Sequence, residues 1–173
     1  AGLPEINIAV NISARQFEES EIVDTVRRAL QQSGLPARQL ELEITEGLLI
    51  NDTPNLRQCF QELKALGVRL SLDDFGTGSC SLVALQQLPL DVIKIDHRFI
   101  RDIPYNVSAT DVASAVIALA RKLHLTVVAE GVETNEQLNY LRQHTCQCAQ
   151  GYLFSKPVSE EAFYELAEKE TLI

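Results

Sequence analysis

Six short apolar runs recur along this chain, and a polar side chain stands at or just beyond the end of each one. The runs, with these polar residues, are 6–10 with Asn11, 40–44 with Glu43 and Glu46, 68–72 with Asp73 and Asp74, 91–95 with Lys94 and Asp96, 125–129 with Glu130, and 146–149 with Gln150. Short apolar runs of this kind are typical of buried strands. Polar groups at the same end of successive strands predict a functional site at one edge of a sheet.

Segments with helical spacing separate these runs. We expect helices at residues 21–33, 52–66, 81–87, 108–123, 134–144 and 159–170. In the second of these, Leu56, Phe60 and Leu63 form an apolar stripe, and Gly67 supplies the stop. Thr134 and Gln137 predict a capping box at the start of the fifth. Strands that alternate with helices favour a parallel sheet.

The spacing of these units favours an α/β barrel. Units of roughly 30 residues match a TIM barrel, which distributes about 250 residues over eight units. A doubly wound open sheet is the alternative, but it binds ligands at one crevice, where the strand order reverses. The chain begins at Ala1 and contains no methionine, so we expect it to be a piece of a longer protein.

The segment 72–78 places two adjacent carboxylates, Asp73 and Asp74, before a glycine-rich turn. Adjacent strand residues face opposite sides of a sheet, so both carboxylates reach one site only where the backbone bends, and Gly76 and Gly78 permit that bend. This favours a metal site, although an Asx-type turn is the alternative. Lys94 has apolar neighbours on both sides, which predicts a position inside the barrel or at its mouth. Glu41, by contrast, is expected on a solvated strand face.

Six motifs carry a resemblance to a known family. They are NISARQF at 11–17, ELEITE at 41–46, LDDFGTG at 72–78, KID at 94–96, AEGVET at 129–134 and QGYLFSKP at 150–157. In this order and spacing they resemble the EAL-type phosphodiesterases of bacterial cyclic di-GMP signalling, over nearly the whole chain. The resemblance implies that residues 1–173 are the C-terminal three-quarters of a single EAL domain, folded as an incomplete TIM-type (β/α) barrel of about six units.

The same resemblance implies a function and a set of site residues. The parent domain would hydrolyse one phosphodiester of cyclic di-GMP to linear pGpG with two Mg²⁺ or Mn²⁺ ions. Asn11, Glu43 and Asp73 would hold the first ion, while Asp73 would bridge to a second ion that Asp74 and Glu130 also bind. Lys94 would hydrogen-bond the attacking water or the developing charge, with Asp96 orienting it. Glu46 would pin the loop after Asp74, Gln150 and Glu133 would border the pocket, and Phe154 and Pro157 would contact a guanine.

The chain also departs from the family. The Glu-Ala-Leu motif that names the family is absent, and Ser79, Cys80 and Ser81 stand where Tyr-Ser-Ser is usual. In the family, this loop meets a partner subunit. His97 and Lys156 replace common arginines. Two alternatives therefore stay open: a catalytically silent cyclic di-GMP receptor or protein-interaction module, and an unrelated metal-dependent barrel. We expect a homodimer or a strand-exchanged assembly, with sensor or cyclase domains upstream and weak activity of this chain alone.

Composition excludes some partners. A net charge of −9 argues against binding DNA or RNA polymers through a basic surface. No apolar run approaches the length of a membrane span. The cysteines at 59, 80, 146 and 148 lack the paired spacing of a zinc site, so we expect reduced thiols in a cytoplasmic protein. Cys146 and Cys148 form the pair to test for redox behaviour.

Overall fold

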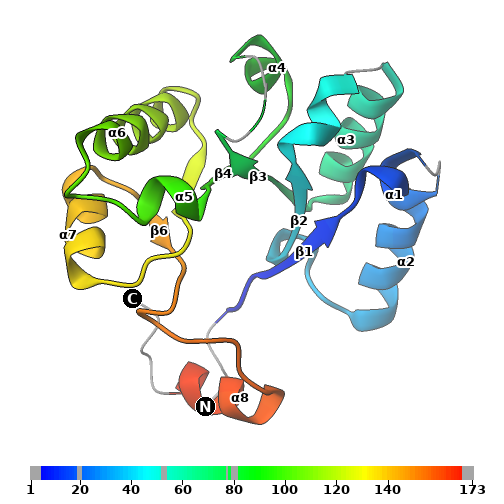
Figure 1. Ribbon diagram of the computed structural model, residues 1–173. Helices are drawn as coiled ribbons and strands as arrows, with labels where there is room; N and C mark the ends of the chain where they lie inside the picture. Colours follow the sequence, from blue (N-terminus) through cyan, green and yellow to red (C-terminus); the bar gives the residue numbers. More distant parts are fainter. Residues whose placement is uncertain (1–4, 19–20, 52–53, 77, 79–81, 169–173) are drawn as a thin grey trace.

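Six parallel strands form one sheet, and the strands follow one another in chain order (Figure 1). The computed structural model describes residues 5–18, 21–51, 54–76, 78 and 82–168. The strands are β1 (Ile8–Ile12), β2 (Leu40–Thr45), β3 (Arg69–Phe75), β4 (Val92–Ile95), β5 (Thr126–Ala129) and β6 (Cys148–Ala149). Within the described residues only consecutive strands pair, which leaves β1 and β6 as the edges of an unclosed sheet.

Helices connect the strands, and most of the longer ones lie around the outside of the curved sheet (Figure 1). They are α1 (Ala14–Glu18), α2 (Ile22–Ser33), α3 (Pro54–Leu66), α4 (Leu82–Gln87), α5 (His97–Ile100), α6 (Val107–Lys122), α7 (Asn135–Gln143) and α8 (Glu160–Glu168), with 3-10 turns η1 (Ala37–Gln39) and η2 (Glu46–Asn51). Helix α8 lies apart from the others, on the side where the sheet stays open. The arrangement confirms the predicted barrel-like succession of units.

The observed bounds differ from the predicted ones at the two strands that matter most for the site. β1 includes Asn11, which was expected just after the strand, and β3 includes Asp73 and Asp74. Helices α1 and α5 were not predicted, because each is too short to show a period. Residues 52–53, 81 and 169–170 of the predicted helices lie outside the described residues, as do Ser79 and Cys80.

The core fills the space between the sheet and its helices. Ile44, Leu70 and Leu72 of the central strands are fully buried, together with Phe60 and Leu63 of α3. Burial of one such side chain contributes about 1.5–3 kcal/mol. The edge strand β1 is different, since Ile8 and Val10 remain 47% and 41% exposed.

The expectation for Glu41 is wrong. Its side chain is buried, with only 8% of the residue exposed, and it pairs with Arg69 of the neighbouring strand at 3.5 Å. Burial raises the pKa of Glu41, and the positive charge of Arg69 opposes that rise. Alternate residues of a strand face the same side of a sheet, so Glu41 and Glu43 of β2 both face the inside of the barrel. The inside of the barrel therefore contains charged groups at both of these positions.

Two further expectations can be compared with the described part of the chain. Its cysteines, Cys59, Cys146 and Cys148, are free thiols. None of the helices described here has both the length and the apolar character needed to cross a membrane.

Candidate metal centre

The C-terminal ends of β1 to β5 bring the polar residues of the sequence runs to one edge of the sheet. The strand register places these residues side by side on neighbouring strands, because Asn11 lies opposite Glu43 and Thr45 lies opposite Asp73. Lys94 on β4 lies opposite Val128, two residues before Glu130. The carboxyl ends of parallel strands are where enzymes of this architecture build their active sites.

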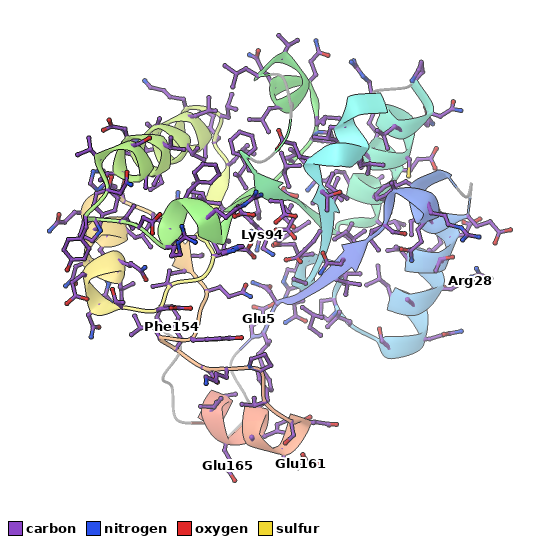
Figure 2. All side chains as sticks on the ribbon, viewed as in Figure 1. Glu5, Arg28, Lys94, Phe154, Glu161 and Glu165 are labelled. Atoms are coloured by element: carbon purple, nitrogen blue, oxygen red, sulfur yellow. The ribbon has the colours of Figure 1, made fainter. Side chains whose placement is uncertain are left out.

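Lys94 stands at the centre of this cluster (Figure 2). It is only 5% exposed. Its Nζ lies 2.7 Å from Glu43 Oε1, 2.7 Å from Glu130 Oε1 and 3.3 Å from Asp73 Oδ1. One ammonium thus joins carboxylates from β2, from β3 and from the residue that follows β5. Buried lysines are rare without such partners.

Asp73 and Asp74 reach one site because the backbone bends at Asp74 itself. Asp74 adopts a left-handed conformation with φ of 56°, and the register with β4 shifts between Leu72 and Phe75. The expected glycine also contributes, since Gly76 has φ of 97°. Left-handed backbone is uncommon outside glycine, although Asp tolerates it better than most residues. The Asp74 backbone N–H donates to Asp73 Oδ1 at 3.0 Å, which holds the Asp73 side chain against the bend.

Three carboxylates converge closely enough to share a cation. Oxygens of Asp73, Asp74 and Glu130 all lie within 4.8 Å of one another. Burial raises the pKa of Glu130 and of Asp74, and the negative charge of Asp73 adds to both effects. Repulsion of this kind is relieved by a cation, and hard divalent ions such as Mg²⁺, Mn²⁺ and Ca²⁺ prefer oxygen ligands. The donor set therefore fits a hard divalent metal.

The formal charges of the cluster also favour binding of a cation. Glu43, Asp73, Asp74 and Glu130 carry four formal negative charges against the one positive charge of Lys94. Burial alone would lower the pKa of Lys94, but the hydrogen bonds that its ammonium donates to Glu130 and Glu43 raise that pKa above its ordinary value. The lysine therefore stays positively charged, and its single charge does not neutralise the four carboxylates. The remaining negative charge favours binding of a cation.

Two of the predicted site residues act on neighbouring segments. Glu46 is 4% exposed, and its Oε2 accepts a hydrogen bond of 2.8 Å from the Gly78 N–H, which ties η2 to the turn after β3. Asp96 is the N-cap of α5, where it accepts from the Arg98 N–H at 2.7 Å and from Arg98 Nε at 3.0 Å. The expected action of Asp96 on the group held by Lys94 stays a prediction.

The remaining predicted residues are not among the carboxylates that contact Lys94 or converge on one another. Asn11 is exposed on the edge strand β1, beside Glu43. Glu133, Gln150 and Pro157 are exposed, while Phe154 is half-buried and packs against the core in the segment that leads toward α8 (Figure 2). The Gln150 backbone clamps the loop after β5, donating to Ala129 O and accepting from the Val132 N–H.

Sequence reasoning gave no role at the site to two residues that organise this edge of the sheet. Arg98 holds Asp96 through its backbone and its guanidinium, and Gln137 joins the loop after β5 to α5 through its amide. The capping-box pattern did identify Gln137, and the structure confirms that box, but the pattern carries no sign of the second set of contacts.

A family model described as EAL domain matches residues 1–157 of this chain. Among curated proteins, the cyclic di-GMP phosphodiesterase NbdA of Pseudomonas aeruginosa is 48% identical over 165 residues, covering 95% of this chain and 21% of that protein. The chain therefore spans about a fifth of that relative's length.

Solved structures give the same picture. The PaMucR phosphodiesterase in complex with c-di-GMP superimposes with a TM-score of 0.86 and 41% identity, covering 91% of this chain and 64% of that chain. A manganese and cyclic di-GMP complex of Klebsiella pneumoniae BlrP1 has a TM-score of 0.82 and 31% identity, covering 88% of this chain and 39% of that chain.

Proposed function

Because this chain belongs to the EAL domain family, we propose that the intact protein hydrolyses one phosphodiester bond of cyclic di-GMP and releases linear pGpG. One observation carries the proposal. Lys94 is buried among carboxylates from three other strand ends, within a group whose chemistry fits divalent metals. This combination suits phosphodiester hydrolysis, since charge develops on both the attacking and the leaving oxygen.

Two Mg²⁺ or Mn²⁺ ions would be held by the residues at the strand ends. Asn11, Glu43 and Asp73 are assigned to one ion, and Asp73, Asp74 and Glu130 to the other. When bound, such ions lower the pKa of water and stabilise the leaving oxygen. The close approach of Asp73, Asp74 and Glu130 supports the second assignment. The register of Asn11 and Glu43 supports the first.

Lys94 would donate a hydrogen bond to the attacking water or to a phosphoryl oxygen as charge develops there. A fixed ammonium in a water-excluded site is effective in this role because its field is poorly screened. Asp96 would orient the group that Lys94 holds. Glu46 would keep the turn after Asp74 in place, and its bond to Gly78 supports that role.

The nucleotide would lie over the loops that follow β5 and β6. Glu133 and Gln150 would border the metal and nucleotide pocket, and Phe154 and Pro157 would contact a guanine. All four residues lie on segments that follow the C-terminal ends of the parallel strands β5 and β6, and this placement supports the assignment.

The assembly is also part of the proposal. We assign residues 1–173 to the C-terminal three-quarters of one EAL domain, with sensor or cyclase domains upstream in a cytoplasmic protein. Ile8 and Val10 are exposed on β1, whose outer edge pairs with no other strand of the described residues, and this favours a homodimer or strand exchange and weak activity of this chain alone. A monodisperse monomer of this chain with full activity would contradict that part.

The test is cyclic di-GMP hydrolysis by the intact protein with Mg²⁺ or Mn²⁺, beside an Asp73→Asn variant. Metal-dependent release of pGpG that the variant loses supports the proposal. Nucleotide binding without turnover would assign the protein to the silent receptors instead, and hydrolysis that persists in the variant would refute the role of Asp73.

A further inference from the structure

Gln137 on α7 is a buried polar residue whose side chain bonds to two separate segments. It is only 4% exposed. Its Oε1 accepts from the backbone N–H of Glu133 at 2.7 Å and of Thr134 at 3.0 Å. Its Nε2 donates to the carbonyl of Ile100 at 3.2 Å and of Arg101 at 3.0 Å. A capping box needs only the first kind of contact, so the bonds from Nε2 are additional.

Both segments that this amide joins begin at residues of the candidate site. The stretch that contains Glu133 and Thr134 starts at Glu130, which contacts Lys94. Helix α5, which ends at Ile100, starts at its N-cap Asp96. Gln137 therefore connects the far ends of two short segments whose near ends lie at the carboxylate cluster.

The two segments also touch directly. Gly131 has φ of 71°, and a Cβ at this position would lie 2.6 Å from His97 Cβ. The loop after β5 thus lies against the first turn of α5 with no space between them. Such a contact holds only if both backbones keep their relative position, and the four hydrogen bonds of Gln137 fix that position at the other end of the contact.

We propose that Gln137 is a positioning residue for the Glu130 side of the metal centre, an inference that rests on the proposed metal-dependent function. It would set the distance between Glu130 and the Asp73–Asp74 pair by holding the loop after β5 against α5. Outer groups that orient metal ligands commonly change metal affinity by about 10–100-fold when they are removed.

Only an amide side chain of this length meets both requirements. Glutamate retains the acceptor for Glu133 and Thr134 but places a carboxylate against two carbonyl oxygens. Methionine keeps the length and lacks the donor altogether. The two variants therefore remove different parts of the connection, and one remains informative if the other does not fold.

The experiment is a Mn²⁺ titration of the intact protein without substrate, after circular dichroism has established folding. We expect Gln137→Glu and Gln137→Met to raise the Mn²⁺ concentration at half-saturation about tenfold. At saturating Mn²⁺, kcat should fall while KM for the nucleotide stays nearly constant. Thr134→Ala is the matched control, because it removes the Thr134 Oγ1 cap of the same helix, which accepts from the Gln137 N–H at 3.2 Å, without removing the Gln137 amide. It should lower Tm and leave Mn²⁺ affinity unchanged.

Unchanged Mn²⁺ affinity in both Gln137 variants would overturn the positioning role, and so would an equal loss in Thr134→Ala, since that would indicate a general effect of helix stability. Failure of the proposed function is a separate result. A wild-type protein that binds Mn²⁺ but hydrolyses no cyclic di-GMP would refute the proposed hydrolase function. The Mn²⁺ affinities of the variants would still test the positioning role of Gln137. A wild-type protein that binds no Mn²⁺ would refute both.

Discussion

Asp74 and Glu130 lie on two sides of one carboxylate cluster, but the protein holds them in different ways. Asp74 is placed by its own backbone, through its positive φ, the shifted register of β3 and the bond from its N–H to Asp73. Glu130 follows a regular strand end, where its N–H donates to Ile95 O. Its loop is then held by Gln150 and Gln137, from other parts of the chain.

The difference shows how one site can combine local and long-range control. The Asp73–Asp74 side depends mainly on a few consecutive residues, although one longer-range bond, between Glu46 and Gly78, holds the turn that follows it. The Glu130 side depends on contacts among α5, α7 and the loop after β6. Substitutions on the first side should therefore act locally, while the second side should respond to changes that are distant in the sequence.

The largest effect is expected from removing a carboxylate on either side. Asp74→Asn and Glu130→Gln should each lower turnover by roughly 10³-fold, the size expected when an electrostatic contact to the transition state is lost. The measurement is pGpG release at saturating Mn²⁺. Asp91→Asn is the matched control, because Asp91 pairs with Lys64 at the opposite end of the sheet, and it should leave turnover within about twofold of wild type. Near-normal turnover in either site variant would contradict the assignment of that carboxylate to the metal centre.

Lys94→Met tests the group between the two sides. Turnover should fall about 10²-fold, because a donor aimed at developing charge is lost. Mn²⁺ should bind more tightly, since a positive charge 2.7 Å from Glu43 and Glu130 no longer competes with it. Without metal the variant should lose about 3–5 kcal/mol of stability, because buried carboxylates lose their partner.

Thermal unfolding with and without Mn²⁺ measures this effect. Metal should restore most of the lost stability of Lys94→Met. A variant that is as stable as wild type without metal, or that binds Mn²⁺ more weakly, would show that the charge of Lys94 does not offset the charge of the buried carboxylates.

A glycine pair tests the contact on the Glu130 side. Gly131→Ala should destabilise the protein by about 1–3 kcal/mol, because the new Cβ meets His97 and the residue must keep a positive φ. Gly47→Ala is the control: its nearest neighbour is Thr45 Oγ1 at 4.0 Å, so its effect should stay within about 0.5 kcal/mol. Urea unfolding measures both variants, and equal stabilities would show that the loop after β5 moves freely against α5.

The smallest effect concerns the cysteines near β6. Burial raises the pKa of Cys146 to about 11, whereas Cys148 is exposed. Since the thiolate is the reactive form, Cys148 should be alkylated by iodoacetamide at pH 8 at least about tenfold faster than Cys146. The rate at Cys146 should rise with pH toward 11. Mass spectrometry of the two labelled positions measures both alkylation rates. Equal rates at pH 8 would mean that β6 opens readily.

The alternation of strands and helices could be predicted from the sequence because apolar periodicity is a local property. All six strand runs overlap strands of the structure, and Leu56, Phe60 and Leu63 are buried as expected. The capping box at Thr134 and Gln137 is also present. The short helices α1 and α5 were missed, although Ser13 with Gln16 and Asp96 are capping signals that could have located them.

The candidate site was less accessible to sequence reasoning. Polar residues at strand ends indicated where the site lies, but the three partners of Lys94 depend on register and barrel curvature, which no local pattern encodes. The bend at Asp74 was assigned to glycines, because an aspartate with positive φ gives no sequence signal. Glu41 was expected to be solvated, because alternation alone does not distinguish the inside of a barrel from its outside.

The most direct measurement is the stoichiometry of Mn²⁺ binding to the intact protein and to Asp73→Asn. The proposed centre predicts two ions per chain, with Asp73 shared between them, so the variant should bind both more weakly. Binding of no Mn²⁺, or of two ions with unchanged affinity in the variant, would contradict a metal centre built on Asp73.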